Sequence, residues 1–195
     1  GTVKGASIKG RRFRTVVRQR YDYSCGSAAL ATLLTSHYRD PIGEQAVFEA
    51  MWKNGDQEKI RREGFSLLDI KQFLEARGYS ADGYEASLDK LQQVGIPAIT
   101  LIRDNGYNHF VVVKGVRDGQ IAVGDPALGA RIIPVEQFEK MRLNRILFVI
   151  NGDRDVAIFN SRADWHVREK APLGLAPDAG NVSNITLLRG GANDF

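Results

Sequence analysis

Apolar residues recur at helical spacing through the first half of the chain, and in the second half they gather in short β-branched runs. Spacings of three and four residues place side chains on one face of a helix. On this basis we predict helices over residues 26–38, 44–53, 66–77 and 87–94. The stretch from 54 to 64 is polar and charged and has no such stripe, so it predicts a loop.

From residue 97 onward the pattern changes to that of a β-sheet. Asp118-Gly119 has the composition of a tight hairpin turn and separates two short apolar runs. We also predict a strand over 13–17 and an edge strand over 156–159. A helical half followed by an antiparallel sheet is an α+β arrangement, with a cleft between the two halves. The predicted strands of the sheet cover 97–102, 110–113, 120–124, 131–134 and 145–150, with a brief helix over 135–141.

The length of 195 residues is that of one domain with a sizeable core. We assign residues 13–150 to this domain, 1–12 to a flexible N-terminal segment and 151–195 to a partly flexible C-terminal extension. No run approaches the ~18 apolar residues that a membrane span requires, and no signal peptide is present. The chain begins at Gly1 rather than Met, which is compatible with removal of an export signal.

Charge and cysteine content narrow the classes of function. The net charge of +4 is only mildly basic, so it gives no reason to expect a nucleic-acid partner. A single cysteine, Cys25, excludes an internal disulfide and a multi-cysteine metal site. No motif indicates a cofactor or a metal. Cysteine usage therefore leaves the redox compartment open.

The only cysteine stands where a turn-like run over 20–24 meets the start of the first long helix. Unpaired backbone N–H groups and the positive end of the helix dipole favour a thiolate at this position. The same N–H groups can stabilise an oxyanion that forms when the sulfur attacks a carbonyl. Ser24 is a candidate N-cap for this helix. A buried structural cysteine is the alternative interpretation of Cys25.

A cysteine nucleophile needs a base, and histidine is the usual one. The chain offers His37, His109 and His166. His37 lies 12 residues beyond Cys25 on the same predicted helix, ~18 Å along the axis at ~1.5 Å per residue, and is too distant. His166 lies in a weakly patterned region and is interpreted as a surface residue. His109 directly precedes the apolar strand over 110–113, a rigid mount for a base, although a structural histidine is the alternative.

Two further side chains complete the candidate site. Asp125 ends the next strand, just before Pro126, and would orient His109 through a hydrogen bond. The hairpin turn sets His109 opposite residue 128, and a bulge would bring Asp125 closer. A turn residue before proline is the other interpretation of Asp125. The amide of Gln19 can donate a second hydrogen bond to the oxyanion, although a lone glutamine is more often a surface residue.

Four local patterns, taken together over about residues 13–150, resemble the peptidase C39 family, the papain-like cysteine peptidases that process bacteriocin precursors. They are Gln19, Cys25-Gly26 followed by Ala28-Ala29-Leu30, His109 with the apolar run after it, and Asp125-Pro126. The resemblance implies a papain-like fold with Cys25 as the nucleophile and His109 as the general base and acid. It also implies that Asp125 orients His109 and that Gln19 lies in the oxyanion hole.

The resemblance implies a cysteine endopeptidase that cleaves a peptide or leader bond after Gly-Gly or Gly-Ala in a bacterial secretion system, with a polypeptide as its substrate. Ser24 stands where many transporter-fused members have Asp, and the chain has neither membrane spans nor a nucleotide-binding glycine-rich loop. It therefore resembles stand-alone members, some of which are exported and accompany the secretion of functional amyloids. That favours a periplasmic location over a cytoplasmic one, and a secretion apparatus or an amyloid subunit as partner.

Two other functions would use the same scaffold. A non-catalytic C39-like module would hold a secreted substrate as a chaperone, but such modules have typically lost the cysteine. An acyltransferase would pass the acyl group to an amine instead of water. Separately, Ile185 and Leu188 before Gly190-Gly191 resemble the end of a double-glycine leader, which suggests the tail as a self-substrate. A flexible tail over 172–195 is the simpler interpretation.

Overall fold

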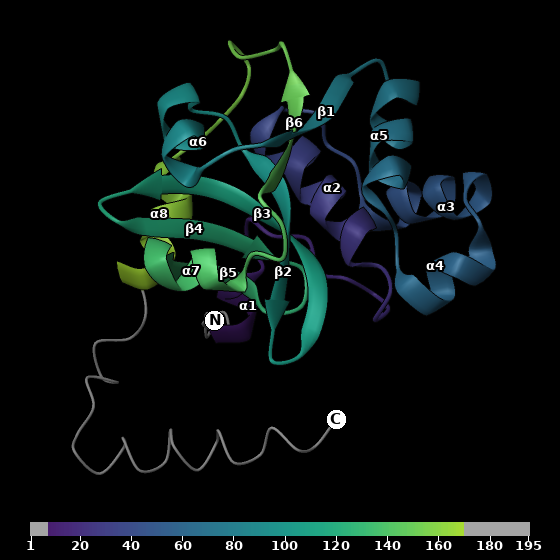
Figure 1. The fold of residues 1–195 in the computed structure, drawn as a ribbon, viewed down its shortest axis with the longest axis horizontal. Helices are drawn as coiled ribbons and strands as arrows, with labels where there is room; N and C mark the ends of the chain where they lie inside the picture. Colours follow the sequence, from purple (N-terminus) through teal and green to yellow (C-terminus); the bar gives the residue numbers. More distant parts are fainter. Residues whose placement is uncertain (1–7, 170–195) are drawn as a thin grey trace, which may run out of the picture.

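The structure, a computed structural model, describes residues 8–169, in which a helical half lies beside a curved sheet (Figure 1). The helical half contains α1 (Ile8–Arg12), α2 (Cys25–His37), α3 (Glu44–Asn54), α4 (Gln57–Glu63) and α5 (Leu67–Ala76). The strands are β1 (Ser80–Glu85), β2 (Ala98–Asp104), β3 (Tyr107–Arg117), β4 (Gln120–Asp125), β5 (Gly129–Pro134) and β6 (Ile146–Asn151). Three more helices accompany the sheet: α6 (Leu88–Val94), α7 (Val135–Met141) and α8 (Arg162–Glu169).

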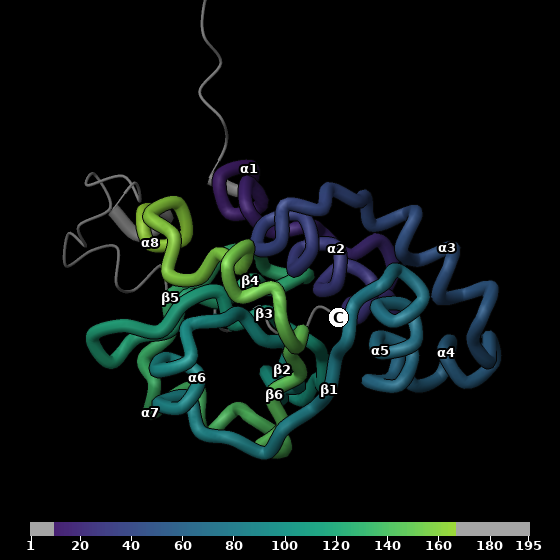
Figure 2. The backbone as a smooth tube through the Cα atoms, turned by 90° about the horizontal axis from the view of Figure 1, so that it is seen from above, coloured from purple at the N-terminus to yellow at the C-terminus, as the bar shows by residue number. Residues whose placement is uncertain are grey.

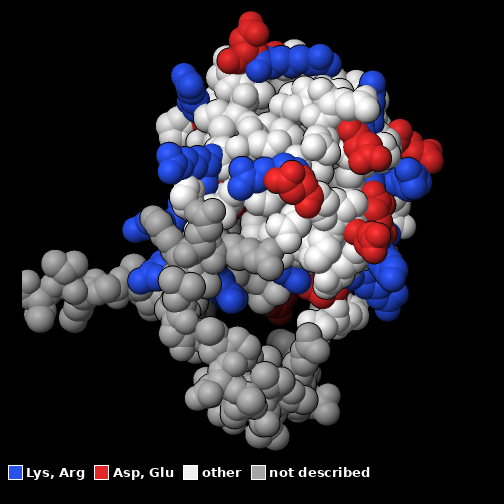
Figure 3. Space-filling view, turned by 90° about the vertical axis from the view of Figure 1, so that its left-hand side faces the viewer, with Lys and Arg blue, Asp and Glu red and all other residues white. Residues whose placement is uncertain are grey.

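All six strands form one antiparallel sheet in the order β1-β6-β2-β3-β4-β5. The sheet curves strongly, with α6 and α7 against one face and α2 against the other (Figure 2). This is the α+β arrangement that the sequence predicted. On the face drawn in Figure 3, basic and acidic side chains are interspersed with uncharged surface. None of the helices among residues 8–169 is both long enough and apolar enough to cross a membrane.

Alternation along β3 supplies two apolar cores. Phe110 and Val112 pack with the residues of α2, α3 and α5, whereas Val111 and Val113 pack with those of α6 and α7. Helix α2 is buried along nearly its whole length. A helix that is apolar on every side belongs in the interior. This central position fixes Cys25, the first residue of α2, against the sheet.

A bulge in β3 changes the pairing between β3 and β4. Gly115 pairs with Ala122, but Val113 pairs with Val123, so Lys114 is an extra residue in β3. Side chains alternate between the two faces of a sheet. One extra residue in β3 therefore changes which residues of β3 and β4 lie on the same face beyond the bulge.

Two predictions of local structure in the first half are wrong. No strand forms over 13–17, because the backbone there bonds to α2 instead of a neighbouring strand: Val17 N–H donates to Thr32 Oγ1 at 2.8 Å. The predicted loop over 54–64 contains α4. Its single buried apolar residue, Ile60, leaves no stripe for a sequence pattern to show.

The predicted edge strand over 156–159 is also wrong, because Ile158 N–H bonds to His37 O at the end of α2 rather than to a strand. Strand β1 was missed by the sequence analysis. Its only buried residue is Ala81, so it shows no apolar alternation.

The other predicted helices and strands are present. The helix predicted over 135–141 has those bounds in α7, and the strand predicted over 110–113 is the middle of the longer β3. The division of the chain at residues 12 and 150 stays a prediction. The tail with Gly190-Gly191 lies outside the described residues, and its self-cleavage stays a hypothesis that the intact masses of wild type and Cys25→Ala would decide.

Candidate active site

Cys25 lies at the start of α2, where the sequence pattern placed it, and it lines a cleft of ≈ 550 Å³. One wall of the cleft comes from the sheet half, through Leu101 of β2 and residues 108–110 of β3. The other wall comes from the α4–α5 region, through residues between Asp56 and Asp69. Cys25 therefore lines a cavity where the two halves meet.

Ser24 stands at the N-cap position of α2, as predicted, but its hydroxyl makes no capping hydrogen bond to the helix. It accepts a hydrogen bond from Tyr21 N–H and donates one to Tyr21 O, both at 2.9 Å, and so closes the turn before the helix. Tyr21 also stacks on Tyr23 with 5.3 Å between the ring centroids. The first-turn N–H groups receive no side-chain cap. They are therefore available to a negative charge in the cleft.

The surroundings of the sulfur differ from the expectation of a thiolate. Burial raises the pKa of the Cys25 thiol, and the negative charge of Asp125 adds to this effect. The backbone N–H groups of Phe110, Gly26 and Cys25 itself act in the opposite direction. Burial outweighs them, so the protonated thiol is favoured in the free protein and a base is needed to activate it.

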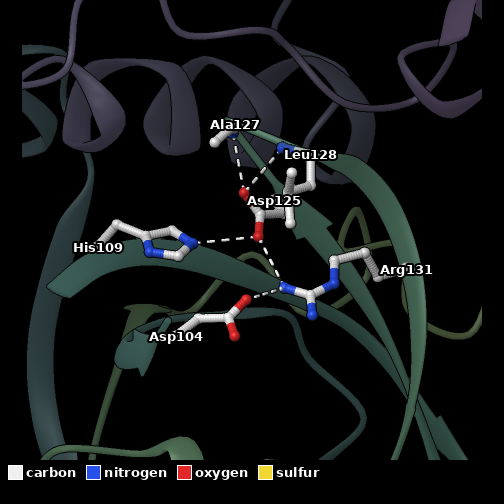
Figure 4. Close-up of polar contacts among 6 residues, drawn as sticks. All are labelled: Asp104, His109, Asp125, Ala127, Leu128 and Arg131. Atoms are coloured by element: carbon white, nitrogen blue, oxygen red, sulfur yellow. Dashed lines mark hydrogen bonds and ion pairs between the residues drawn. The ribbon is translucent and has the colours of Figure 1, made fainter. Parts of the chain in front are cut away.

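The structure brings His109 and Asp125 together (Figure 4). His109 Nε2 donates to Asp125 Oδ2 at 3.1 Å, and Oδ1 accepts from the N–H groups of Ala127 at 2.8 Å and Leu128 at 3.1 Å. Burial alone raises the pKa of Asp125, but the hydrogen bonds from these three residues outweigh it and hold that pKa below its usual value. An ionised Asp125 keeps the hydrogen on Nε2, which leaves Nδ1 as the nitrogen that can accept a proton.

The β3 bulge places Asp125 on the same face of the sheet as His109. Beyond the bulge Gly124 pairs with Val112, so Asp125 stands opposite Val111, two residues from His109. Diagonal neighbours of this kind are within reach of long side chains. If the register before the bulge continued unchanged, Asp125 would stand opposite Val112 and would face α2 instead.

Two residues that the sequence analysis did not identify extend this network. Arg131 of β5 places Nη1 3.0 Å from Asp125 Oδ2 and 2.8 Å from Asp104 Oδ2 (Figure 4). Asp125 pairs with Gly129 across a tight turn, so Arg131 is its diagonal neighbour on β5. That register would have identified Arg131, but it depends on where β5 begins, and the sequence pattern placed the start two residues too late.

Gln19 approaches the network through its main chain. Its N–H donates to Pro126 O at 3.0 Å, in the turn that follows Asp125. Its side-chain Nε2 donates to Tyr21 O at 3.1 Å, and its Oε1 is buried without a hydrogen-bond partner among the described residues. Gln19 thus connects the turn before Cys25 with the turn after Asp125, and its place in an oxyanion hole stays a prediction.

The other two histidines are not among the residues that line the cleft. His37 is buried, and its Nδ1 donates to Ile158 O at 2.5 Å. His166 lies on α8, where its Nε2 accepts from Arg162 Nε at 2.8 Å. Among residues 8–169 no group of three His, Cys, Asp or Glu side chains is placed to hold a metal ion.

Comparison with known proteins identifies the family of this chain. Residues 14–153 match the model of the peptidase C39 family. The chain is 44% identical over 146 residues to the probable functional amyloid protease FapD of Pseudomonas aeruginosa, and 40% identical over 150 residues to that of Pseudomonas fluorescens. The alignments cover 75% and 77% of this chain but only 64% and 66% of those relatives, slightly less than two thirds of their length.

Among solved structures, the chain is similar to a double glycine motif protease from an AMS/PCAT transporter, determined in complex with the leader peptide. The sequence identity is 27% and the TM-score 0.57, over 69% of this chain and 89% of that chain.

Proposed function

Because the chain belongs to the peptidase C39 family, we propose that it is a cysteine endopeptidase that cleaves a peptide or leader bond after Gly-Gly or Gly-Ala in a bacterial secretion or processing system. The observation that carries the proposal is that His109, which is bonded to Asp125, lines the same cleft as Cys25, the only cysteine of the chain. The similarity to FapD and to a double glycine motif protease supports the reaction and the substrate class.

In the first half of the reaction, His109 takes the proton of the Cys25 thiol as the sulfur attacks the scissile carbonyl. Asp125 holds a hydrogen on Nε2, so Nδ1 receives this proton, and the carboxylate then stabilises the imidazolium. Negative charge moves to the carbonyl oxygen, where the Cys25 N–H and the Gln19 amide stabilise it. Gln19 Nε2 carries two hydrogens, so one can bond the oxyanion while the other stays on Tyr21 O.

In the second half, the C–N bond of the substrate breaks and the imidazolium of His109 gives its proton to the leaving amine. The acyl group is now joined to the Cys25 sulfur as a thioester. His109 then removes a proton from water, and the resulting oxygen nucleophile attacks the thioester. The sulfur leaves and regains the proton from His109, so one water is consumed for each peptide bond broken.

The proposed partners follow from the same relatives. We assign the substrate to secreted polypeptides, with a secretion apparatus or an amyloid subunit as partner and the periplasm, rather than the cytoplasm, as the compartment. The naming of the Pseudomonas relatives as probable functional amyloid proteases supports the amyloid subunit as partner, and the compartment stays a prediction.

The test is cleavage of a synthetic peptide in which an apolar stretch precedes Gly-Gly-Ala, with the products identified by mass spectrometry. Wild type is expected to hydrolyse the bond after the second glycine. Cys25→Ala and His109→Ala are expected to lower the rate by about 10³-fold or more. His166→Ala is the matched control, because it removes a histidine that does not line the cleft, and it should keep the wild-type rate.

Labelling with iodoacetamide separates the competing functions, because Cys25 is the only cysteine that can react. A wild type that is labelled at Cys25 and binds glycine-rich peptides without cutting any of them contradicts the proposal and indicates a binding module. Transfer of the acyl group to an added amine, with no hydrolysis product, contradicts it in favour of an acyltransferase.

A further inference from the structure

The chain beyond the family-matched region packs against β3 and α2. The strap, defined here as residues 157–165, follows the end of the match at residue 153 and includes the first turn of α8. Ile158 of the strap donates its N–H to His37 O and accepts from the His37 ring through its carbonyl. Trp165 is buried. The strap is therefore attached to the helical half and to the sheet half together.

The strap bonds to β3 just beyond the point where the pairing of β3 with β2 ends. Pairing of β2 with β3 ends at Val113, and beyond it β3 has no partner strand on that side among the described residues. Asn160 donates its backbone N–H to Lys114 O and its side-chain Nδ2 to Val116 O, each at 3.1 Å. Gly115 lies beneath it, where any Cβ would collide with Asn160. These contacts fit the strap onto the bulge.

Lys114, the extra residue of the bulge, is held from two directions. Its side chain is 1% exposed, and its Nζ lies 2.6 Å from Asp164 Oδ1 of the strap. The same Nζ donates to Thr15 O at 2.5 Å, in the segment that leads to α2. Removing one partner of a buried ion pair is strongly destabilising, because the other charge is left without compensation. Asp164 is thus what allows a lysine to occupy the bulge.

The lysine stem lies next to the active-site network. A Cβ at Gly124 would stand 3.1 Å from the Cδ of Lys114, so the stem packs directly on the backbone that precedes Asp125. The bulge at Lys114 is also the feature that turns Asp125 to the face of His109. A continuous set of contacts therefore joins Asp164 of the strap to the carboxylate that bonds His109.

We propose that the strap positions the active site: Asp164 and Asn160 hold the Lys114 bulge, and the bulge holds Asp125 beside His109. Asp164 is then a positioning residue, although it lies outside the region matched by the family model. The effect of the strap on kcat rests on the proposed peptidase function. The effect of the strap on the His109–Asp125 hydrogen bond does not, so the two effects are tested separately.

The kinetic test is a double-mutant cycle on the full chain with the Gly-Gly-Ala peptide. Asp164→Asn is expected to lower kcat about 10-fold or more with KM little changed, because its effect reaches only the orientation of His109. In an Asp125→Asn background the same substitution is expected to change kcat less than 2-fold, since the group it positions is already lost. Equal factors in the two backgrounds, or no change in kcat for Asp164→Asn, would overturn the proposal.

Two further variants protect this test against a failure to fold. Asn160→Ala removes one side-chain hydrogen bond at the bulge and leaves the buried ion pair intact, so it is expected to reproduce the coupling with Asp125→Asn at a smaller amplitude. Asp155→Asn is the matched control, because Asp155 is an exposed acid just before the strap, and it should leave kcat unchanged. An Asn160→Ala effect that does not depend on Asp125 would also overturn the proposal.

The geometric test needs no activity. In the Cys25→Ala protein, the proton on His109 Nε2 that bonds to Asp125 is expected to give a downfield ring N–H resonance, assigned by its loss in His109→Gln. Adding Asp164→Asn should weaken or remove that resonance while Asp155→Asn leaves it in place. A resonance that is unaffected by Asp164→Asn rejects the inference. If wild type cuts no peptide, the peptidase proposal fails while this measurement still decides the positioning.

Discussion

At the residue scale, the Asp125 carboxylate is held by donors on both of its oxygens. Two N–H groups of the following turn bond to Oδ1, while His109 and Arg131 share Oδ2. Asp125 is fully buried, and hydrogen bonds to a charged group in such surroundings are the strong ones. Its orientation toward His109 is therefore set by three separate segments: its own turn, β3 and β5.

The first prediction concerns Arg131, which bridges the carboxylates of Asp125 and Asp104. Arg131→Gln is expected to lower kcat/KM by about 10-fold, since Asp125 keeps its turn contacts but loses one charged donor. Arg131→Lys should recover part of this loss, because both contacts come from the single nitrogen Nη1 and an ammonium can also donate to two carboxylates. The measurement is peptide hydrolysis. Wild-type kcat/KM in both variants would show that Asp125 does not depend on Arg131.

The second prediction concerns the pH dependence of Cys25. Burial raises the pKa of this thiol, and Asp125 raises it further, so the thiolate is scarce until the pH exceeds the range of an ordinary cysteine. The rate of iodoacetamide labelling should therefore rise with a midpoint above that of a free thiol, about 8.5. Asp125→Asn removes one of the two causes and should move the midpoint downward. A wild-type midpoint near or below neutral pH would mean that a thiolate–imidazolium pair already exists in the free protein.

At the scale of elements, the sequence predicted those that bury a periodic apolar face. Helix α2 and the strands β2 to β6 show such a face, and the pattern located all of them. It missed α1, α8, α4 and β1, of which α4 and β1 have one buried residue each, Ile60 and Ala81. Their position depends on neighbours distant in sequence, because α4 packs on α3 and β1 pairs with β6.

The candidate site was also predicted only in part from the sequence. The hairpin at Asp118-Gly119 correctly made β3 and β4 neighbours, but simple counting set His109 opposite residue 128 and left Asp125 on the other face. The extra residue Lys114 reverses that result. No local pattern indicates this extra residue, because Asp164, the charged partner of the buried lysine, lies 50 residues further along the chain.

The third prediction tests how closely α2 packs on the wall of the cleft. A Cβ at Gly26 would lie 2.9 Å from Phe65 Cβ, so Gly26→Ala forces the two segments apart. We expect a loss of about 1–2 kcal/mol in the free energy of unfolding, since overpacking exceeds the gain in helix propensity. Gly43→Ala at the start of α3 is the control, because a Cβ there meets nothing within 4 Å. Urea denaturation measures both, and equal stabilities of the two variants would refute the close packing.

At the scale of the whole molecule, the two halves are joined by polar contacts as well as by the shared core. Gln19 bonds to Pro126, Lys114 bonds to Thr15, and His37 bonds to Ile158 of the strap. Each of these contacts connects the segment around α2 with the sheet or with the strap. Global stability and active-site geometry therefore depend on the same buried polar groups, and one of these groups titrates within the acid range.

The last prediction is that protonation of His37 destabilises the whole fold. Burial, and then the positive charge of Lys114, lower the pKa of His37 to about 4 from 6.5; Ile158 O and Asp164, which also face it, act weakly the other way. A lowered pKa means that the stability is fully present above about pH 6.5 and is lost as the pH falls toward 4, by up to about 3 kcal/mol.

His37→Asn keeps a donor near the position of Nδ1 and cannot be protonated. It should be less stable at pH 7 because it leaves a cavity, yet lose less stability between pH 6.5 and pH 4. Denaturation at both pH values measures the difference. Parallel slopes for wild type and His37→Asn would show that the acid sensitivity arises from the carboxylates instead.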